Sequence, residues 1–282
     1  MNYYNERNGL MKKCLEIDLE KLKDYFRQTY IYFVNRGYFE FAIKGAWEKP
    51  AYQDAYLVEP PTFIPSAEVY FANKLQNAEV WPVHMNIENY DEATLFTVIE
   101  ILYDHIAVYD RSREKVVKDY PRKEFSEQIN NLLKAYKDGY YLEPTSGYIM
   151  RIPNQALQEQ LKERTDDMPD DVIDKLSAAT RMYYRFDSSM EEKKKAINIL
   201  ADILENVRDD VKDIFDKEHL GKKPHDSLIF NIVNGFNIRH NKKGQKTEYS
   251  KDIWYDWMMQ YYTSVIIAYY KIKKDREYDD LF

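Results

Sequence analysis

Cysteine and glycine are scarce in this chain of 282 residues, which holds one cysteine, Cys14, and eight glycines. A single thiol excludes an internal disulfide and a cysteine-based zinc site, and it favours a reducing compartment. So few glycines leave little room for a glycine-rich phosphate loop, and neither a Gly-x-Ser-x-Gly nor a His-Glu-x-x-His motif is present. We therefore expect neither a metal nor a cofactor.

Long apolar runs are absent as well. No stretch approaches the roughly 20 apolar residues of a membrane span, and the amino terminus has no apolar segment of signal-peptide length. The most apolar late segment, 261–270, is short and continues into Lys271, Lys273 and Lys274. The net charge of -7 argues against binding nucleic acid over the whole surface and leaves open only a local basic patch. We expect a cytoplasmic protein without membrane contact.

Apolar and aromatic residues are plentiful, and most of them recur at helical spacing. The hydrophobic fraction is 44%, enough for a sizeable core, and tyrosine alone supplies 26 residues. In the first helix the stripe is expected to run from Leu15 to Val34. Residues 91–106 form a more apolar helix with Asp91 as its cap, and this helix should be central to the first half. The predicted fold class is mainly α.

The polar stretch RTDDMPDD divides the chain in two. We predict an accessory or sensor region at residues 1–167, which is mostly helical with an α+β character, and a helical bundle at residues 168–282. The first region carries one β-hairpin near residues 140–152. There an aromatic strand is followed by a turn with Pro144 and Gly147 and by a second strand.

Amphipathic segments fill the second region, and a four- to five-helix bundle is the economical arrangement for them. They cover residues 170–185, 190–215, 226–236 and 252–270. Ser189 and Glu192 stand at capping-box spacing and start the second of these helices. The apolar stripe of the last helix begins with Ile253, Trp254 and Trp257. The acidic tail after Lys274 is expected to be exposed.

Reactive polar side chains concentrate at the end of the third of these helices. Arg239 and His240 follow its apolar stripe, and a half-buried guanidinium requires a carboxylate, a carbonyl array or a phosphate. Asn234 precedes them on the helix and Asn241 follows. This pattern predicts a cationic pocket for a polyanion, with one histidine able to move protons. The lysines that complete the pocket are Lys242, Lys243 and Lys246.

Two other interpretations remain open. In the first, the cluster is structural: asparagines cap the helix end, the basic side chains suit the helix dipole, and Arg239 pairs with Asp252 or Asp256 on the facing helix. In the second, the first half is a small-molecule enzyme that uses His105 and Tyr103 on the last turn of its apolar helix. No sequence motif supports this small-molecule enzyme.

The segment NIVNGFNIRHNKKGQKTEYSKDIWYDWMMQYY resembles the end of HEPN-type helical domains in bacterial abortive-infection and toxin–antitoxin proteins. The resemblance covers roughly residues 170–274 and is firmest at roughly 226–262. It implies a four- to five-helix bundle, a homodimer and a metal-independent endoribonuclease. In that family an arginine stabilises the charge of the phosphorane, while a distal histidine moves the proton of a ribose 2′-hydroxyl.

The chain departs from the family motif. Arg239 matches the motif arginine and His240 stands at the polar position after it, but Lys243, Gly244 and Gln245 occupy the place of the distal histidine. Either His240 transfers the proton in a variant motif or the domain is not catalytic. We predict an anti-phage defence or toxin-type effector with Arg239 and His240 as catalytic residues and RNA as substrate. The alternative is a non-catalytic interaction or sensor subunit that binds a partner protein or a phage trigger.

Overall fold

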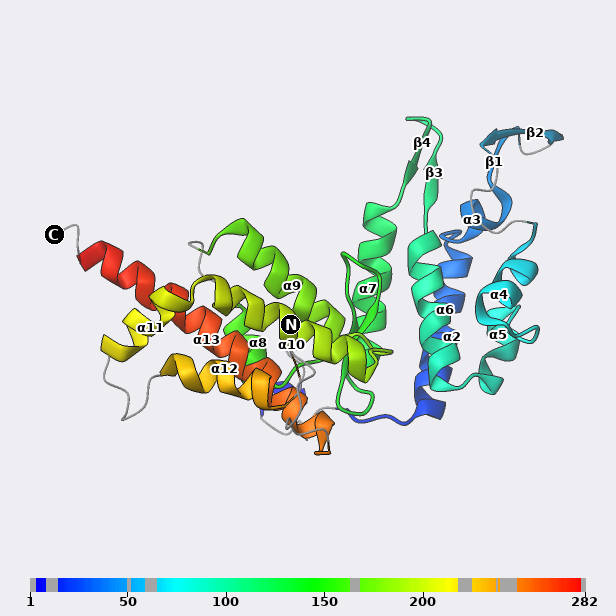
Figure 1. Ribbon diagram of the computed structural model, residues 1–282. Helices are drawn as coiled ribbons and strands as arrows, with labels where there is room; N and C mark the ends of the chain where they lie inside the picture. The colour runs from blue at the N-terminus through cyan, green and yellow to red at the C-terminus, as the bar shows by residue number, and fades with distance from the viewer. Residues whose placement is uncertain are drawn as a thin grey trace. The chain divides into compact units, whose positions relative to one another are not determined.

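The computed structural model describes residues 4–8, 15–49, 52–58, 65–162, 168–217, 225–236, 238 and 248–279. They form two compact units, Met1–Ile152 and Pro153–Phe282. Helices dominate both units (Figure 1), which confirms the mainly α class. The division falls earlier than the polar stretch near residue 167, because helix α8 (Gln155–Lys162) packs against α13 (Lys251–Asp279) of the second unit.

Helix α6 (Glu92–His105) supplies much of the buried apolar surface of the first unit. Asp91 caps it by accepting a hydrogen bond from the backbone N–H of Thr94 at 2.7 Å, as predicted. Helix α7 (Asp119–Leu133) packs against α6, and α2 (Leu19–Asn35) packs against α7. The side chains that α6 buries are Leu95, Phe96, Val98, Ile99, Leu102, Tyr103 and His105.

Helix α2 begins at Leu19 and buries Leu22, Phe26, Tyr30 and Phe33. The prediction that its stripe runs from Leu15 to Val34 is wrong at both ends, since these side chains are 63% and 42% exposed. Leu15 precedes the helix, and Val34 follows Phe33 by one residue, which turns its side chain by about 100° away from the buried face.

Short helices and strands complete the first unit. Ser66 caps α4 (Ala67–Leu75) by accepting a hydrogen bond from the backbone N–H of Val69 at 3.3 Å. The remaining short helices are α1 (Tyr4–Arg7), α3 (Glu40–Lys44), α5 (Val83–Asn86) and the 3₁₀ helix η1 (Ile87–Asn89).

The predicted hairpin is present. β5 (Tyr140–Leu142) pairs antiparallel with β6 (Ile149–Arg151). The sequence predicted one pair of strands, but the described residues contain two further antiparallel pairs. β1 (Ala46–Lys49) pairs with β2 (Tyr52–Val58), and β3 (Val108–Asp110) pairs with β4 (Lys115–Val117). Strands as short as β3 and β4 are too short for an alternating pattern to stand out in the sequence.

The second unit is a bundle-like assembly of helices. Helix α10 packs against both α9 and α13, and α11 packs against α12. Ser189 and Glu192 form the predicted capping box at the start of α10. The helices that precede α13 in the bundle are α9 (Asp170–Tyr184), α10 (Met190–Asn206), α11 (Arg208–Lys217) and α12 (His225–Gly235).

Two predictions about these helices need correction. The helix expected over residues 190–215 is divided at Val207, whose backbone leaves the helical conformation at φ -117° and ψ 22°. The last amphipathic segment was expected over residues 252–270, but α13 continues beyond it to Asp279, and Asp275 in the acidic tail is exposed as expected. There the guanidinium of Arg276 donates a hydrogen bond to the carbonyl of Ile214 at 3.1 Å, which ties the end of α13 to α11.

Candidate functional site

Most of the predicted site lies outside the described residues: Arg239, His240, Asn241, Lys242, Lys243 and Lys246. Asn234 is described and is exposed on α12. The two carboxylates considered as partners of Arg239 have other partners within the second unit. Asp252 lies 3.4 Å from the Lys193 ammonium, and Asp256 accepts a hydrogen bond from the Tyr183 hydroxyl at 2.6 Å.

The helices on either side of that segment are tied together. The Tyr262 hydroxyl of α13 is fully buried and donates to the carbonyl of Ile229 in α12 at 2.6 Å. Just before α13, the Tyr249 hydroxyl donates to the carbonyl of Phe236 at 2.8 Å. These two hydrogen bonds join α12 and Phe236 after it to α13 and Tyr249 before it.

Aromatic rings gather where α13 begins. The ring of Phe236 lies 4.5 Å from that of Trp254, and Trp257 stacks on Tyr261 at 5.1 Å with an interplanar angle of 7°. Ile253, Trp254 and Trp257, which we call the α13 aromatic face, are 70%, 38% and 42% exposed. Exposed tryptophans grouped with an exposed isoleucine are a common sign of a binding surface.

The sequence pattern assigned these three residues to the apolar stripe, and that prediction is wrong. The buried face of α13 instead runs through other positions of the helix. Its members include Tyr255, Met258, Met259, Tyr262, Ile266 and Tyr269. Helical spacing identifies the stripe only approximately, because two neighbouring faces of α13 are both rich in aromatic residues.

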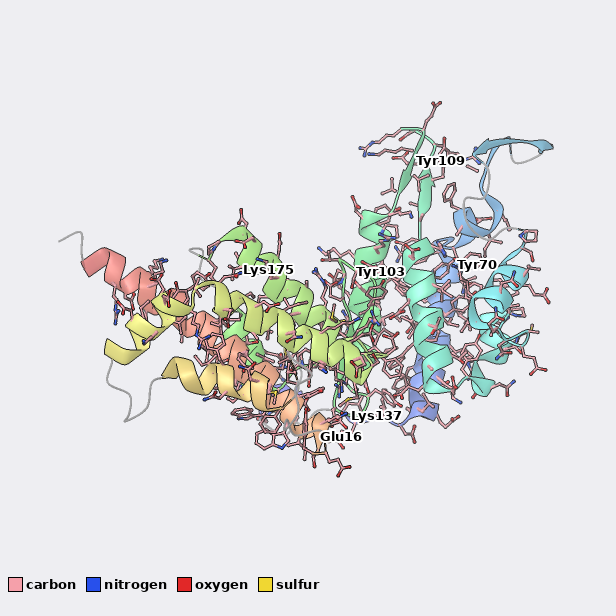
Figure 2. The ribbon with its side chains drawn as sticks, in the orientation of Figure 1. Glu16, Tyr70, Tyr103, Tyr109, Lys137 and Lys175 are labelled. Carbon is pink, nitrogen blue, oxygen red and sulfur yellow. The ribbon has the colours of Figure 1, made fainter. Side chains whose placement is uncertain are left out.

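A separate cavity of about 440 Å³ opens beside the last turn of α6 in the first unit, and we call it the His105 pocket. Helix α4, helix α7 and the β5–β6 loop supply the other walls. Two of its wall residues, Tyr70 and Tyr103, are labelled in Figure 2. The side chains used below are Tyr70, Lys74, Tyr103, His105, Arg122 and Tyr148.

His105 is buried in this wall and bonded to α4. Its Nε2 lies 2.8 Å from the Tyr70 hydroxyl, and the two rings meet edge to face. Burial lowers the pKa of His105, against the opposing effect of Asp104, and burial also raises the pKa of Tyr70. At neutral pH the pair is therefore an uncharged imidazole and an uncharged phenol. The cations that lower the His105 pKa further are Lys118, Arg122 and Lys74.

Arg122 closes the carboxyl end of α6. Its Nε donates to the carbonyl of Tyr103 at 3.2 Å, and its Nη2 donates to the carbonyl of Asp104 at 2.7 Å and pairs with the Asp104 carboxylate at 3.0 Å. The last carbonyls of a helix have no partner within the helix. The guanidinium therefore serves the helix end and the neighbouring carboxylate.

Tyr103 holds the β5–β6 loop in place. Its hydroxyl donates to the carbonyl of Pro144 at 2.7 Å. Gly147 adopts a positive φ of 74° against the Tyr103 ring, where a Cβ would come within 3.0 Å of Cδ1. Glycine is needed there both for the backbone conformation and for the close approach. Tyr103, which the sequence offered as a reactive group beside His105, thus shapes the pocket wall.

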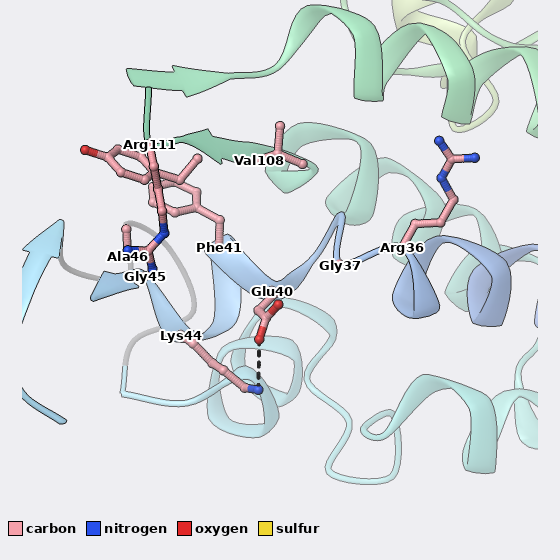
Figure 3. A pocket seen from close by; sticks show the side chains of 10 residues that line it. Arg36, Gly37, Glu40, Phe41, Lys44, Gly45, Ala46, Val108 and Arg111 are labelled. Carbon is pink, nitrogen blue, oxygen red and sulfur yellow. Dashed lines mark hydrogen bonds and ion pairs between the residues drawn. The ribbon is translucent and has the colours of Figure 1, made fainter. Parts of the chain in front are cut away.

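A second cavity, of about 500 Å³, lies between α3 and β3 (Figure 3). Lys44 in its wall pairs with Glu40 at 3.3 Å. The Arg36 guanidinium bonds the Tyr38 hydroxyl at 3.0 Å and pairs with Glu124 at 3.2 Å, and it points away from Lys44 in the close view. Lys44 and Arg36 therefore do not point toward a common position in this cavity.

The sequence pointed to His105 but gave no signal for Tyr70, Lys74 or Tyr148 in the same pocket. These residues are far apart in the chain and belong to no motif, so only folding brings them together. Within the described ranges, no cluster of three or more His, Cys, Asp or Glu side chains could hold a metal ion. The same ranges contain no helix that is long and apolar enough to cross a membrane.

No family model matches this chain. Neither a curated protein nor a solved structure is significantly similar to it. The likeness to HEPN-type domains stays a prediction, and so do the roles of Arg239 and His240.

Proposed function

We propose that the protein is an anti-phage defence or toxin-type effector whose second unit is a HEPN-like, metal-independent endoribonuclease. The α13 aromatic face carries the proposal, because two exposed tryptophans follow shortly after the basic segment RHNKKGQK. Single-stranded nucleic acid is held by aromatic rings on which bases stack and by cationic side chains that attract the backbone. With a net charge of -7, such attraction has to be confined to a patch.

In this proposal each polar residue of the segment has a role. Arg239 binds the scissile phosphate and stabilises its developing charge. His240 transfers the proton of the attacking 2′-hydroxyl, a role worth about 10²–10⁴ in rate. Asn234 and Asn241 orient the substrate, and a homodimer would place two segments across one groove. The side chains that attract the backbone are Lys242, Lys243 and Lys246.

Cleavage of a labelled single-stranded RNA in the presence of a chelator tests the catalytic roles. We expect cleavage by the wild-type chain and its loss in the Arg239→Ala and His240→Ala variants. Wild-type cleavage that both variants retain would show that these residues are not the catalytic pair.

RNA binding tests the aromatic face separately. Stacking of one base is worth about 1–3 kcal/mol, so Trp254→Ala and Trp257→Ala should each weaken binding by about tenfold in an anisotropy titration. Met85→Ala, which removes another exposed apolar side chain, is the matched control and should bind as wild type does. Unchanged affinity in both tryptophan variants would contradict the assigned RNA surface.

The second candidate function is a non-catalytic interaction module, and Ile253 is the observation that favours it. An aliphatic side chain that is 70% exposed beside two tryptophans suits an apolar pocket on a partner protein better than a base. Toxicity on expression that depends on Arg239 supports the nuclease. A stable complex with a partner that Ile253→Asp abolishes, with no RNA cleavage, supports the module.

A further inference from the structure

The cavity between α3 and β3, which we call the Arg111 cavity, is lined by more cations than carboxylates. Among the described residues of its wall, the cations are Arg36, Lys44 and Arg111, and the carboxylate is Glu40. Three cations against one carboxylate leave these wall residues with a net charge of +2. A wall of this charge favours an anion over a cation or an uncharged molecule.

Two of the three cations already have a carboxylate partner. Lys44 lies 3.3 Å from Glu40. Arg36 lies 3.2 Å from Glu124, which is not a wall residue. The guanidinium of Arg111, in contrast, makes neither an ion pair nor a hydrogen bond with a residue that the structure describes. An unpaired guanidinium can hold a carboxylate or a phosphate through two parallel hydrogen bonds.

The neighbouring carboxylate in the β3–β4 turn is engaged elsewhere. Asp110 accepts hydrogen bonds from the backbone N–H of Ser112 at 2.9 Å and from its hydroxyl at 2.6 Å. Asp110 also lies 3.8 Å from Arg113. The Arg111 side chain extends from the end of β3 toward Gly45 in the close view (Figure 3). The positive charge that remains in the cavity wall is therefore that of Arg111.

Apolar and aromatic side chains line the cavity beside this charge. The Tyr109 ring stacks on that of Phe41, with centroids 6.0 Å apart and an interplanar angle of 15°. Phe41 belongs to a buried cluster with Ala46 and Ala107. Gly45 ends α3 at φ 69° and ψ -163°, a conformation that is essentially restricted to glycine, so the wall has no side chain at this point. The cavity thus offers apolar surface as well as charge.

We propose that the Arg111 cavity binds a small organic anion, namely a carboxylate or a phosphate attached to an aromatic body. Arg111 pairs with the anionic group, and Phe41 and Tyr109 contact the aromatic body. A cavity of about 500 Å³ falls within the range of small-molecule sites, which combine a mostly apolar lining with a few polar groups. The proposal concerns the first unit and does not depend on the ribonuclease proposed for the second.

Calorimetric titration of the full chain tests the charge and the body of the ligand separately. The probes are phenyl phosphate, benzoate, inorganic phosphate, the cation benzylammonium and the uncharged benzyl alcohol. We expect phenyl phosphate or benzoate to bind most tightly, and the tighter of these two identifies the anionic group. Added salt should weaken the binding, because Arg111 is exposed and its charge is screened.

Variants assign the binding to named residues. Arg111→Gln should weaken the binding of the tighter anion by about tenfold, the loss of a hydrogen bond to a charged group. Arg113→Gln is the matched control, because it removes the same charge from the same turn at an exposed residue outside the cavity wall. Tyr109→Ala should reduce the advantage of phenyl phosphate over inorganic phosphate.

Three results overturn the proposal: no binding of either aromatic anion at millimolar concentration, benzylammonium or benzyl alcohol binding as tightly as the anions, or equal affinities of the Arg111→Gln and Arg113→Gln variants. Equal binding of phenyl phosphate and inorganic phosphate would overturn the part given to Phe41 and Tyr109. Both arginines are exposed, so their comparison holds even where Tyr109→Ala fails to fold. Circular dichroism of each variant identifies such a failure.

Discussion

The Tyr70 hydroxyl lies 2.8 Å from Nε2 of His105 and joins α4 to the last turn of α6. The two residues are separated by 34 others in the chain, so the bond forms only when the helices pack. It satisfies a polar side chain that would otherwise be costly to bury. It also fixes the imidazole at the wall of a cavity, where protonation of the buried ring should change the free energy of unfolding.

Acidification should therefore destabilise the first unit. Burial lowers the pKa of His105 in the folded chain, so the unfolded chain binds more protons as the pH falls through about 6.5. The free energy of unfolding should decrease in that window, as measured by urea titration at a series of pH values. His105→Gln should flatten this slope, whereas His84→Gln, at an exposed histidine of α5, should not.

The link between Tyr38 and Glu124 gives a second prediction. The Tyr38 hydroxyl donates to the Glu124 carboxylate at 2.7 Å, and this bond is the main cause of the lowered pKa of Glu124. Tyr38→Phe should lower the free energy of unfolding by about 1–2 kcal/mol. Tyr120→Phe is the control, because its side chain is 51% exposed and its hydroxyl bonds to no other described residue. Equal losses in the two variants would contradict this account.

The capping box of α10 gives a third prediction. Glu192 accepts hydrogen bonds from the backbone N–H and the hydroxyl of Ser189, each at 2.9 Å, and these bonds, with Arg185, hold its pKa at about 2. Because the folded pKa is depressed, the stability that Glu192 contributes is present above about pH 4.3 and is lost as the pH falls towards about 2. Glu192→Gln should remove this acid sensitivity in a circular dichroism titration, and the exposed Glu191→Gln should retain it.

The same capping box can be tested at neutral pH. Ser189→Ala removes the hydroxyl that accepts the backbone N–H of Glu192 at 3.3 Å. Loss of a helix cap costs about 1 kcal/mol, so the midpoint of urea unfolding should fall accordingly. Ser188→Ala, next in the chain, removes a different bond, to the Met182 carbonyl, and should leave the acid sensitivity of Glu192 intact.

A buried tyrosine connects α12 and α13 and gives a further prediction. Tyr262→Phe removes the hydrogen bond to the Ile229 carbonyl and should cost about 1 kcal/mol of stability. The neighbouring Tyr261→Phe is the control, because the Tyr261 hydroxyl makes no hydrogen bond to another described residue. If the proposed ribonuclease depends on the contact between α12 and α13, RNA cleavage should also fall in the first variant and not in the second.

Local features could be predicted from the sequence because their physics is local. The caps at Asp91 and Ser189 each join a side chain to a backbone group three residues away, so the residue types and their spacing are enough. The hairpin of β5 and β6 was recognisable for the same reason, since its turn residues stand next to its strands.

The sequence did not reveal which of two neighbouring apolar faces of a helix is buried. Ile253, Trp254 and Trp257 have the spacing of a core stripe, but α13 presents a different stripe to α10. The break at Val207 likewise has no proline or glycine to mark it. Where several faces of a helix are apolar, the packing partner decides which of them is buried.

The sequence by itself determined that this protein is mainly helical, where many of its helices begin, and which short basic segment deserves a test with RNA. Only the tertiary structure decided that Tyr70, His105, Lys74 and Tyr148 share one cavity and that two tryptophans remain exposed. The reason is the range of the interactions. Helix propensity and capping act within a few residues, whereas a pocket and an exposed face arise from contacts between segments distant in the chain.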